Sequence, residues 1–212
     1  MAIVSAHMIL SVLAALLYGV LAWRASQLSA AGARRLLLAV AAVHAGGLIT
    51  GFFVPPPAFG FAPAVSVSAW LVLVVYLLES RALPQLRARG FLALVGMVAV
   101  VLPLIFPGRA LPPEQSAWMG IHIALGMASY ALFACAVLHA WLVTRAEAAL
   151  RQPGSDSLLT GNLPVLTLER LMLGFVLAGW LALTATLAAG LFFDEQIYGA
   201  AMPFQWTHKV VF

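Results

Sequence analysis

The sequence predicts an all-α, polytopic membrane protein, a transmembrane helical bundle with six visible spans and the start of a seventh. The first observation behind this prediction is composition, since 64% of the 212 residues are hydrophobic, 8% are charged and the mean hydropathy is +1.04. A water-soluble domain of this size would not carry so much apolar surface. The second is that apolar stretches of roughly bilayer-spanning length recur along the chain. We therefore expect one integral membrane domain over residues 1–212.

Six apolar stretches define the expected helices. The first is long enough to cross a bilayer and has no preceding basic segment, so it is expected to be an uncleaved helix and not a signal peptide. The third and fourth are the shortest, and the glycine and prolines between Phe59 and Pro63 leave the start of the third poorly defined. The expected spans are Ile3–Trp23, Leu36–Val54, Ala64–Leu78, Phe91–Phe106, Trp118–Val143 and Leu171–Phe193.

The last residues resemble the first turn of a further helix. The chain stops four residues after His208, at Phe212, inside an apolar segment. Because a span cannot end there, we expect the sequence to be truncated at its C-terminus and to lack at least one helix.

Basic residues fall mainly into alternate loops. Nine lie on one side of the expected membrane and two, Arg109 and Lys209, on the other. This asymmetry places the N-terminus outside, because loops rich in arginine stay on the cytoplasmic side of a membrane. The net charge of +4 forms no continuous basic stripe, so the expected partner is the lipid bilayer and not nucleic acid. The nine are Arg24, Arg34, Arg35, Arg81, Arg87, Arg89, Arg145, Arg151 and Arg170.

The sequence lacks several groups and motifs that particular functions would require. Cys135 is the single cysteine, so the chain has neither a disulfide framework nor a Cys-x-x-Cys-His site for covalent haem attachment. All seven acidic residues fall outside the expected spans, whereas a proton-coupled pump would need a buried carboxylate. No phosphate-binding loop or zinc-protease motif is present. We expect no catalytic residues and no enzyme activity.

The histidines are the candidate ligands. His122 lies about 6 Å below the start of the fifth span and His208 opens the next segment, so both are expected at the outer face. Two neutral imidazoles there can ligate a metal, and they can hold a flat cofactor such as haem. Contact with water at the membrane surface is the simpler alternative. His44 falls near the midplane of the second span, where a ligand and a structural role are equally plausible. The two glycines that follow this histidine would let a neighbouring helix or a planar ligand approach closely. For His7 and His139 we expect a structural role, as a hydrogen bond between helices or, at an interface, contact with water.

Aromatic residues gather on the same outer side. Trp118 and Trp206 flank the two outer histidines and could pack against a porphyrin edge. A belt of interfacial aromatic residues predicts the same positions, so both interpretations stay open.

The residues that follow His122 resemble a motif of a known family. The run from His122 to Leu132 resembles the His-x6-Ser-Tyr helix of the cytochrome c assembly (haem-handling, CcsA-type) superfamily, with Ser129 and Tyr130 as the serine and tyrosine. The later stretch to His208 is similar to the shorter YpjD/HemX-like inner-membrane branch. The resemblance covers nearly the whole chain and is most specific over residues 118–212. The region before His208 keeps one tryptophan, Trp206, and lacks the tryptophan-rich pattern of the cytochrome c synthases.

The resemblance implies a haem-binding or haem-handling protein of the bacterial cytoplasmic (inner) membrane that is involved in cytochrome c assembly, with cytochrome c maturation proteins as possible partners. It maps the first outer histidine of the family onto His122 and places the second a full helix after the tryptophan-rich region, so that His208 is a substitute ligand, a haem-access residue or neither. From the residues we expect b-type, non-covalent haem with His122 and His208 as iron ligands and with His44, Trp206 and Trp118 as further cofactor-binding residues. One alternative is a scaffold or accessory subunit of a maturation complex that carries no haem. A small-solute transporter is less favoured, because no polar residues recur at corresponding positions of two halves.

Overall fold

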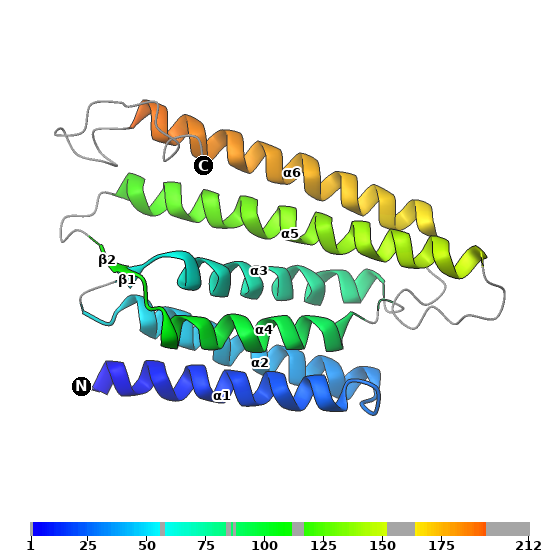
Figure 1. Ribbon diagram of the computed structural model, residues 1–212, viewed down its shortest axis with the longest axis horizontal. Coiled ribbons are helices and arrows are strands. Elements are labelled where there is room, and N and C mark those ends of the chain that lie inside the picture. Colours follow the sequence, from blue (N-terminus) through cyan, green and yellow to red (C-terminus); the bar gives the residue numbers. More distant parts are fainter. Residues whose placement is uncertain are drawn as a thin grey trace.

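The computed structural model describes residues 2–55, 58–83, 86, 88–111, 117–151 and 164–193, and it confirms the all-α membrane fold (Figure 1). Five of the six helices in these ranges have the length and apolar composition to cross a membrane, and the 17-residue α4 falls short of that length. The expectation of six spans is thus met by five long helices and one shorter helix packed beside them. The predicted start of a seventh span, after His208, lies outside the described residues. The helices are α1 (Ala2–Arg24), α2 (Ala30–Phe52), α3 (Phe61–Ala82), α4 (Arg89–Ile105), α5 (Ala117–Arg151) and α6 (Val165–Phe192).

The helices form two packed units. In the four-helix body, α1 contacts α2 and α4, and α3 contacts the same two helices, so the four close into a ring. Helices α5 and α6 pack along each other as a hairpin beside this body (Figure 1). The hairpin meets the body mainly where α5 packs on α3. Helix α3 is therefore the element shared by both units.

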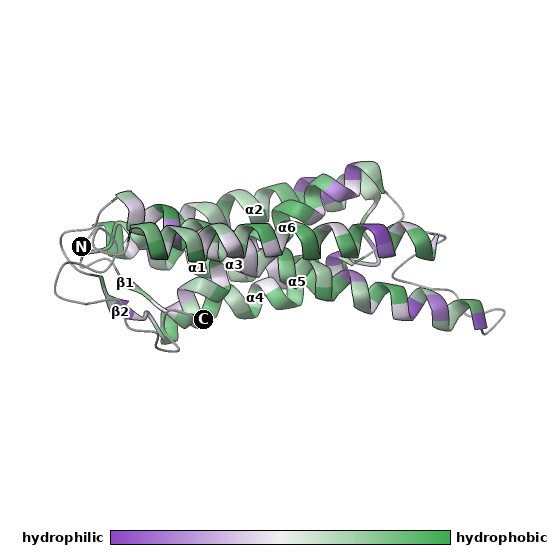
Figure 2. Cartoon of the chain, turned by 90° about the horizontal axis from the view of Figure 1, so that it is seen from above, coloured by the Kyte–Doolittle hydropathy of each residue, from purple (hydrophilic) through white to green (hydrophobic). Residues whose placement is uncertain are grey.

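Polar and charged residues gather at one end of the helices (Figure 2). We call this the basic end, defined by Arg24, Arg81, Arg89 and Arg145, and we call the opposite end, where α1 begins, the N-terminal end. Between the ends the outer surface is apolar, and large side chains such as Leu16 are mostly exposed there. Such a surface suits the hydrocarbon of a bilayer, which matches the multi-pass membrane protein expected from the sequence.

Small residues let α1 and α2 approach closely, as the glycine pair after His44 predicted. A Cβ atom added to Gly47 would lie 3.3 Å from the Ser11 hydroxyl and 3.6 Å from the Ser11 backbone nitrogen. The His7 Nδ1–H donates a hydrogen bond of 2.9 Å to the Gly47 carbonyl oxygen. The prediction that His7 bonds between helices is thus confirmed, because backbone contact brings a carbonyl within its reach.

A two-stranded hairpin joins two loops at the N-terminal end. Strand β1 (Ala58–Phe59) pairs antiparallel with β2 (Arg109–Ala110) and so links the α2–α3 and α4–α5 connections. Gly108 has a φ of +90°, and a Cβ atom there would lie 2.5 Å from the Phe59 carbonyl oxygen. The sequence did not predict this pair of strands, since two residues are too few to form a periodic pattern.

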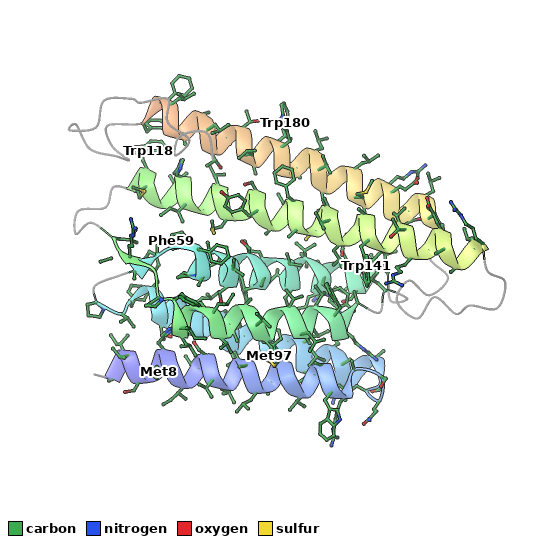
Figure 3. The ribbon with its side chains drawn as sticks, in the orientation of Figure 1. Met8, Phe59, Met97, Trp118, Trp141 and Trp180 are labelled. Atoms are coloured by element: carbon green, nitrogen blue, oxygen red, sulfur yellow. The ribbon has the colours of Figure 1, made fainter. Side chains whose placement is uncertain are left out.

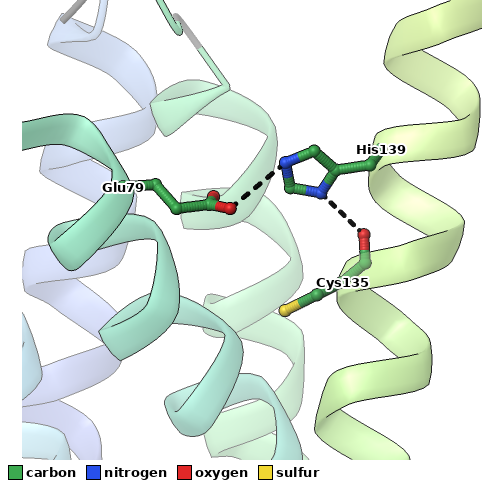
Figure 4. Close-up of polar contacts among 3 residues, drawn as sticks. All are labelled: Glu79, Cys135 and His139. Carbon is green, nitrogen blue, oxygen red and sulfur yellow. Dashed lines mark hydrogen bonds and ion pairs between the residues drawn. The ribbon is translucent and has the colours of Figure 1, made fainter. Parts of the chain in front are cut away.

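One buried pair joins the body to the hairpin at the basic end. The His139 Nε2 atom lies 3.3 Å from the Glu79 Oε1 atom, and the His139 Nδ1–H donates to the Cys135 carbonyl oxygen at 2.8 Å (Figure 4). The exposed fraction of the side chain is 1% for His139 and 12% for Glu79. The hydrogen bond of His139 to Cys135 thus stays within α5, and its contact with another helix is the ion-pair contact with Glu79. Helix α3 continues one turn past Leu78, where the third span was expected to end, and so includes Glu79.

We predict that Glu79 and His139 are energetically coupled. Replacing Glu79 with leucine should lower the free energy of unfolding by roughly 1–3 kcal/mol, because it leaves the buried His139 Nε2 without a polar neighbour. Glu79→Gln should cost less, since its amide can donate to that nitrogen. Reversible unfolding of the purified protein in mixed micelles measures both effects.

The double variant Glu79→Leu/His139→Leu provides the control. It should be more stable than the sum of the two single substitutions predicts, because it removes both polar groups together. Strict additivity of the three free energies would contradict the coupling.

Candidate functional site

His122 lies near the N-terminal end of α5, about a turn and a half after the helix begins at Ala117. Its side chain is half-buried against α6, and its Nδ1–H donates a hydrogen bond of 3.1 Å to the Thr186 carbonyl oxygen. In the neutral ring this bond places the lone pair on Nε2. Metal-binding histidines commonly donate their other ring N–H to a backbone carbonyl in this way, so the geometry of His122 fits an iron ligand.

Helices α5 and α6 lie in close contact beside that bond. Gly126 follows His122 by four residues on the same face of α5, and a Cβ atom there would lie 3.7 Å from the Thr186 methyl carbon. The Thr186 hydroxyl donates to the Ala182 carbonyl oxygen at 2.8 Å, so its polar group is satisfied within α6. A larger residue at Gly126 would narrow the space that the two helices share beside His122.

Trp118 extends the same end of the hairpin. Its ring stacks on the Phe193 ring with centroids 3.6 Å apart and planes 8° apart, and 37% of its surface stays exposed (Figure 3). The contact fixes an aromatic surface one turn before His122. This is the position at which the sequence predicted either a porphyrin contact or an interfacial belt.

The other predicted outer residues, His208 and Trp206, lie outside the described residues. The pairing of His122 with His208 therefore stays a prediction.

His44 belongs to the four-helix body and not to the hairpin that carries His122. It is fully buried; its Nδ1 is hydrogen-bonded to the Tyr18 hydroxyl at 2.9 Å and its Nε2 to the Ser66 hydroxyl at 3.0 Å. These bonds connect α1, α2 and α3. Both ring nitrogens already have partners, so coordination of iron would require one bond to break. Sequence spacing gave no signal for Tyr18 or Ser66, because neither shares a helix with His44.

The pocket beside His44 is small. Its volume is about 170 Å³, and His7, Ser11, His44 and Ser66 line it. Pockets that hold drug-sized ligands usually measure about 300–1,000 Å³. The pocket therefore suits water or a small polar molecule better than a porphyrin.

A second, larger cleft lies between α3, α4 and α5. Its volume is about 1150 Å³ and its lining is almost entirely apolar. Tyr130 lines it, whereas the Ser129 hydroxyl donates to the Gly126 carbonyl oxygen at 2.8 Å within α5. His122 is not among its lining residues. The serine and tyrosine of the α5 motif thus have different surroundings, and the cleft is separate from the His122 end of the hairpin.

Within the described ranges, no group of three or more histidine, cysteine, aspartate or glutamate side chains is placed to hold a metal ion. A haem iron needs only one or two protein ligands, because the porphyrin supplies the other four nitrogens. Single histidines such as His122 are therefore the relevant candidates.

Comparison with known proteins agrees with this arrangement. The model of the cytochrome C assembly protein family matches residues 3–212, which is nearly the whole chain. No curated protein and no solved structure matches the sequence. A match of this extent, on a membrane bundle with a histidine at the end of α5, shows that the chain belongs to the cytochrome c assembly protein family.

Proposed function

We propose that this cytochrome c assembly protein binds b-type, non-covalent haem through His122 and passes it on during cytochrome c maturation. The observation that carries the proposal is the hydrogen bond from His122 Nδ1 to the Thr186 carbonyl, which orients the ring and puts the lone pair on Nε2. Trp118, stacked on Phe193, adds an aromatic surface for the porphyrin edge one turn away. Iron and porphyrin would supply the reactivity, and the helices would supply ligand and access. The protein itself needs no catalytic residue for this role.

His208 and Trp206 complete the proposed site. Both follow α6 in the sequence, and α6 ends at Phe192 beside the N-terminal end of α5. A segment that continues from this point starts on the side of the membrane where His122 lies. In this proposal His208 would be the second iron ligand and Trp206 a second aromatic contact.

The proposed orientation places this site outside the cytoplasm. Arginines dominate the basic end, and basic loops remain on the cytoplasmic side of the membrane. The N-terminal end, with His122 and Trp118, would then face outward from the bacterial inner membrane. Cytochrome c maturation proteins that attach haem on that side would be its partners.

The contacts of His44 favour a structural role over the role of ligand predicted from the sequence. A buried imidazole with a hydroxyl at each nitrogen has all its hydrogen-bonding capacity satisfied. We therefore propose that His44 joins α1, α2 and α3 and does not touch the iron.

One prediction of this proposal concerns the visible absorption spectrum. The full-length protein purified in detergent should show a Soret band, with α and β bands after dithionite reduction, because histidine-ligated haem absorbs strongly there. His122→Ala should abolish or shift these bands, since it removes the ligand; His208→Ala should do the same. Visible spectra of the oxidised and reduced proteins make the comparison.

His7→Ala is the matched control, because His7 also bonds to a backbone carbonyl in a neighbouring helix and lies outside the proposed site. Its spectrum should be unchanged. A protein that stays colourless after haem addition would contradict haem binding, and a haem-free scaffold subunit would then be the better description.

The second prediction separates His44 from His122. His44→Leu should lower the free energy of unfolding by roughly 1–2 kcal/mol, because it removes two hydrogen bonds between helices. Its haem spectrum should stay that of the parent protein. Unfolding in mixed micelles and a visible spectrum of the same sample measure the two effects.

Ser66→Ala, which removes one of the two bonds, should lower stability by about half as much. Loss of the Soret band in His44→Leu, with stability unchanged, would mean that His44 is a ligand after all.

A further inference from the structure

The apolar cleft between α3, α4 and α5 has features of a binding site that the proposed function does not use. It measures about 1150 Å³, and its α5 wall runs from Met127 to Trp141, about 21 Å along the helix. This wall is partly open: Val137 is 70% exposed and Tyr130 is 51% exposed. The few polar groups in the lining belong to Ser68, Tyr130 and Trp141.

Aromatic rings mark the end of the cleft nearest the basic end. Phe91 of α4 and Trp141 of α5 stack there, with ring centroids 5.4 Å apart and planes 28° apart. Figure 3 shows Trp141 at this end of α3 and Phe59 at the other. The α4 part of the lining extends only from Phe91 to Gly96, the first turns of that helix. The part of the cleft enclosed by all three helices therefore lies toward the basic end.

A positive charge sits beside this ring pair. The Arg145 guanidinium carbon lies 5.3 Å from the Trp141 ring centroid, and the arginine side chain is exposed. Arg89 begins α4 at the same end and donates to the Leu28 carbonyl oxygen at 3.1 Å. Glu147 is two residues after Arg145, so it lies on another face of α5. An apolar cleft with a cation at one end matches a molecule with an anionic head and apolar chains.

We propose that this cleft binds an anionic phospholipid, with its phosphate at Arg145 and its acyl chains along the cleft. One leaflet of hydrocarbon is about 15 Å deep, which the 21 Å wall can accommodate, whereas a spanning helix needs about 30 Å of contact. Among the described residues no histidine lines the cleft, so this part of the lining offers no imidazole ligand for haem iron. Since the lipid would fill the space between α4 and α5, it would also add packing contacts between the α5–α6 hairpin and the four-helix body. The inference is independent of haem binding at His122.

The test is native mass spectrometry of the full chain after equilibration with equal amounts of phosphatidylglycerol and phosphatidylcholine carrying the same acyl chains. The protein should retain more phosphatidylglycerol than phosphatidylcholine. Arg145→Gln should lower the ratio of retained phosphatidylglycerol to phosphatidylcholine about fivefold, the effect of one basic group at a membrane surface. Arg24→Gln should leave the ratio unchanged, because Arg24 lies over Trp23 at 5.5 Å, and Trp23 does not line the cleft as Trp141 does.

A second pair of variants tests the acyl-chain part. Ala134→Trp should fill the cleft and reduce retention of both lipids, since Ala134 lines it and is exposed. Leu177→Trp, on the exposed surface of α6, should change nothing. Circular dichroism and size-exclusion elution confirm that each variant is folded.

Three results would overturn the proposal. One is equal retention of the two lipids by the parent protein, or retention of neither. Another is that Arg24→Gln lowers the preference for phosphatidylglycerol as much as Arg145→Gln does. The third is that Ala134→Trp displaces haem or a co-purifying protein and leaves lipid retention unchanged.

Discussion

The contact between α3 and α5 is the interaction on which the rest of the structure depends. Helix α3 completes the ring of the four-helix body, and α5 carries both His122 and the contact with α6. In a bilayer the hydrophobic effect gives little force to bring helices together, so association relies on close packing and polar contacts. The buried Glu79–His139 pair is such a contact. The position of the His122 site relative to the body therefore follows from this contact.

The four described histidines share one principle of placement, although their surroundings differ. Buried polar groups in a membrane must find partners within the protein, since lipid offers none. His7 and His122 each donate to a backbone carbonyl of a neighbouring helix, whereas His44 is held between two hydroxyl groups. Glu79 is the neighbour of His139. The arrangement at His122 supports a ligand role because its helix end also carries the Trp118 surface.

Much of the fold could be predicted from the sequence, because hydropathy and arginine distribution depend on composition alone. Each expected span contains or overlaps one helix, and the glycines after His44 do allow close approach of α1. Contacts between distant residues could not be predicted. The partners of His44, the Glu79–His139 pair and the cleft beside Tyr130 all depend on which helices are neighbours. The predicted third span stopped at Leu78, short of the end of α3, because an acidic residue lowers the local hydropathy without interrupting the helix.

The most direct test of the account is the low-temperature electron paramagnetic resonance spectrum of the ferric, haem-loaded full chain, because it reports the ligands of the iron itself. We expect a low-spin signal from nitrogen-ligated iron in the parent protein, and conversion to a high-spin signal in His122→Ala. The low-spin signal should persist in His7→Ala. An unchanged low-spin signal in His122→Ala would contradict the assignment of His122 as the haem ligand at the end of α5.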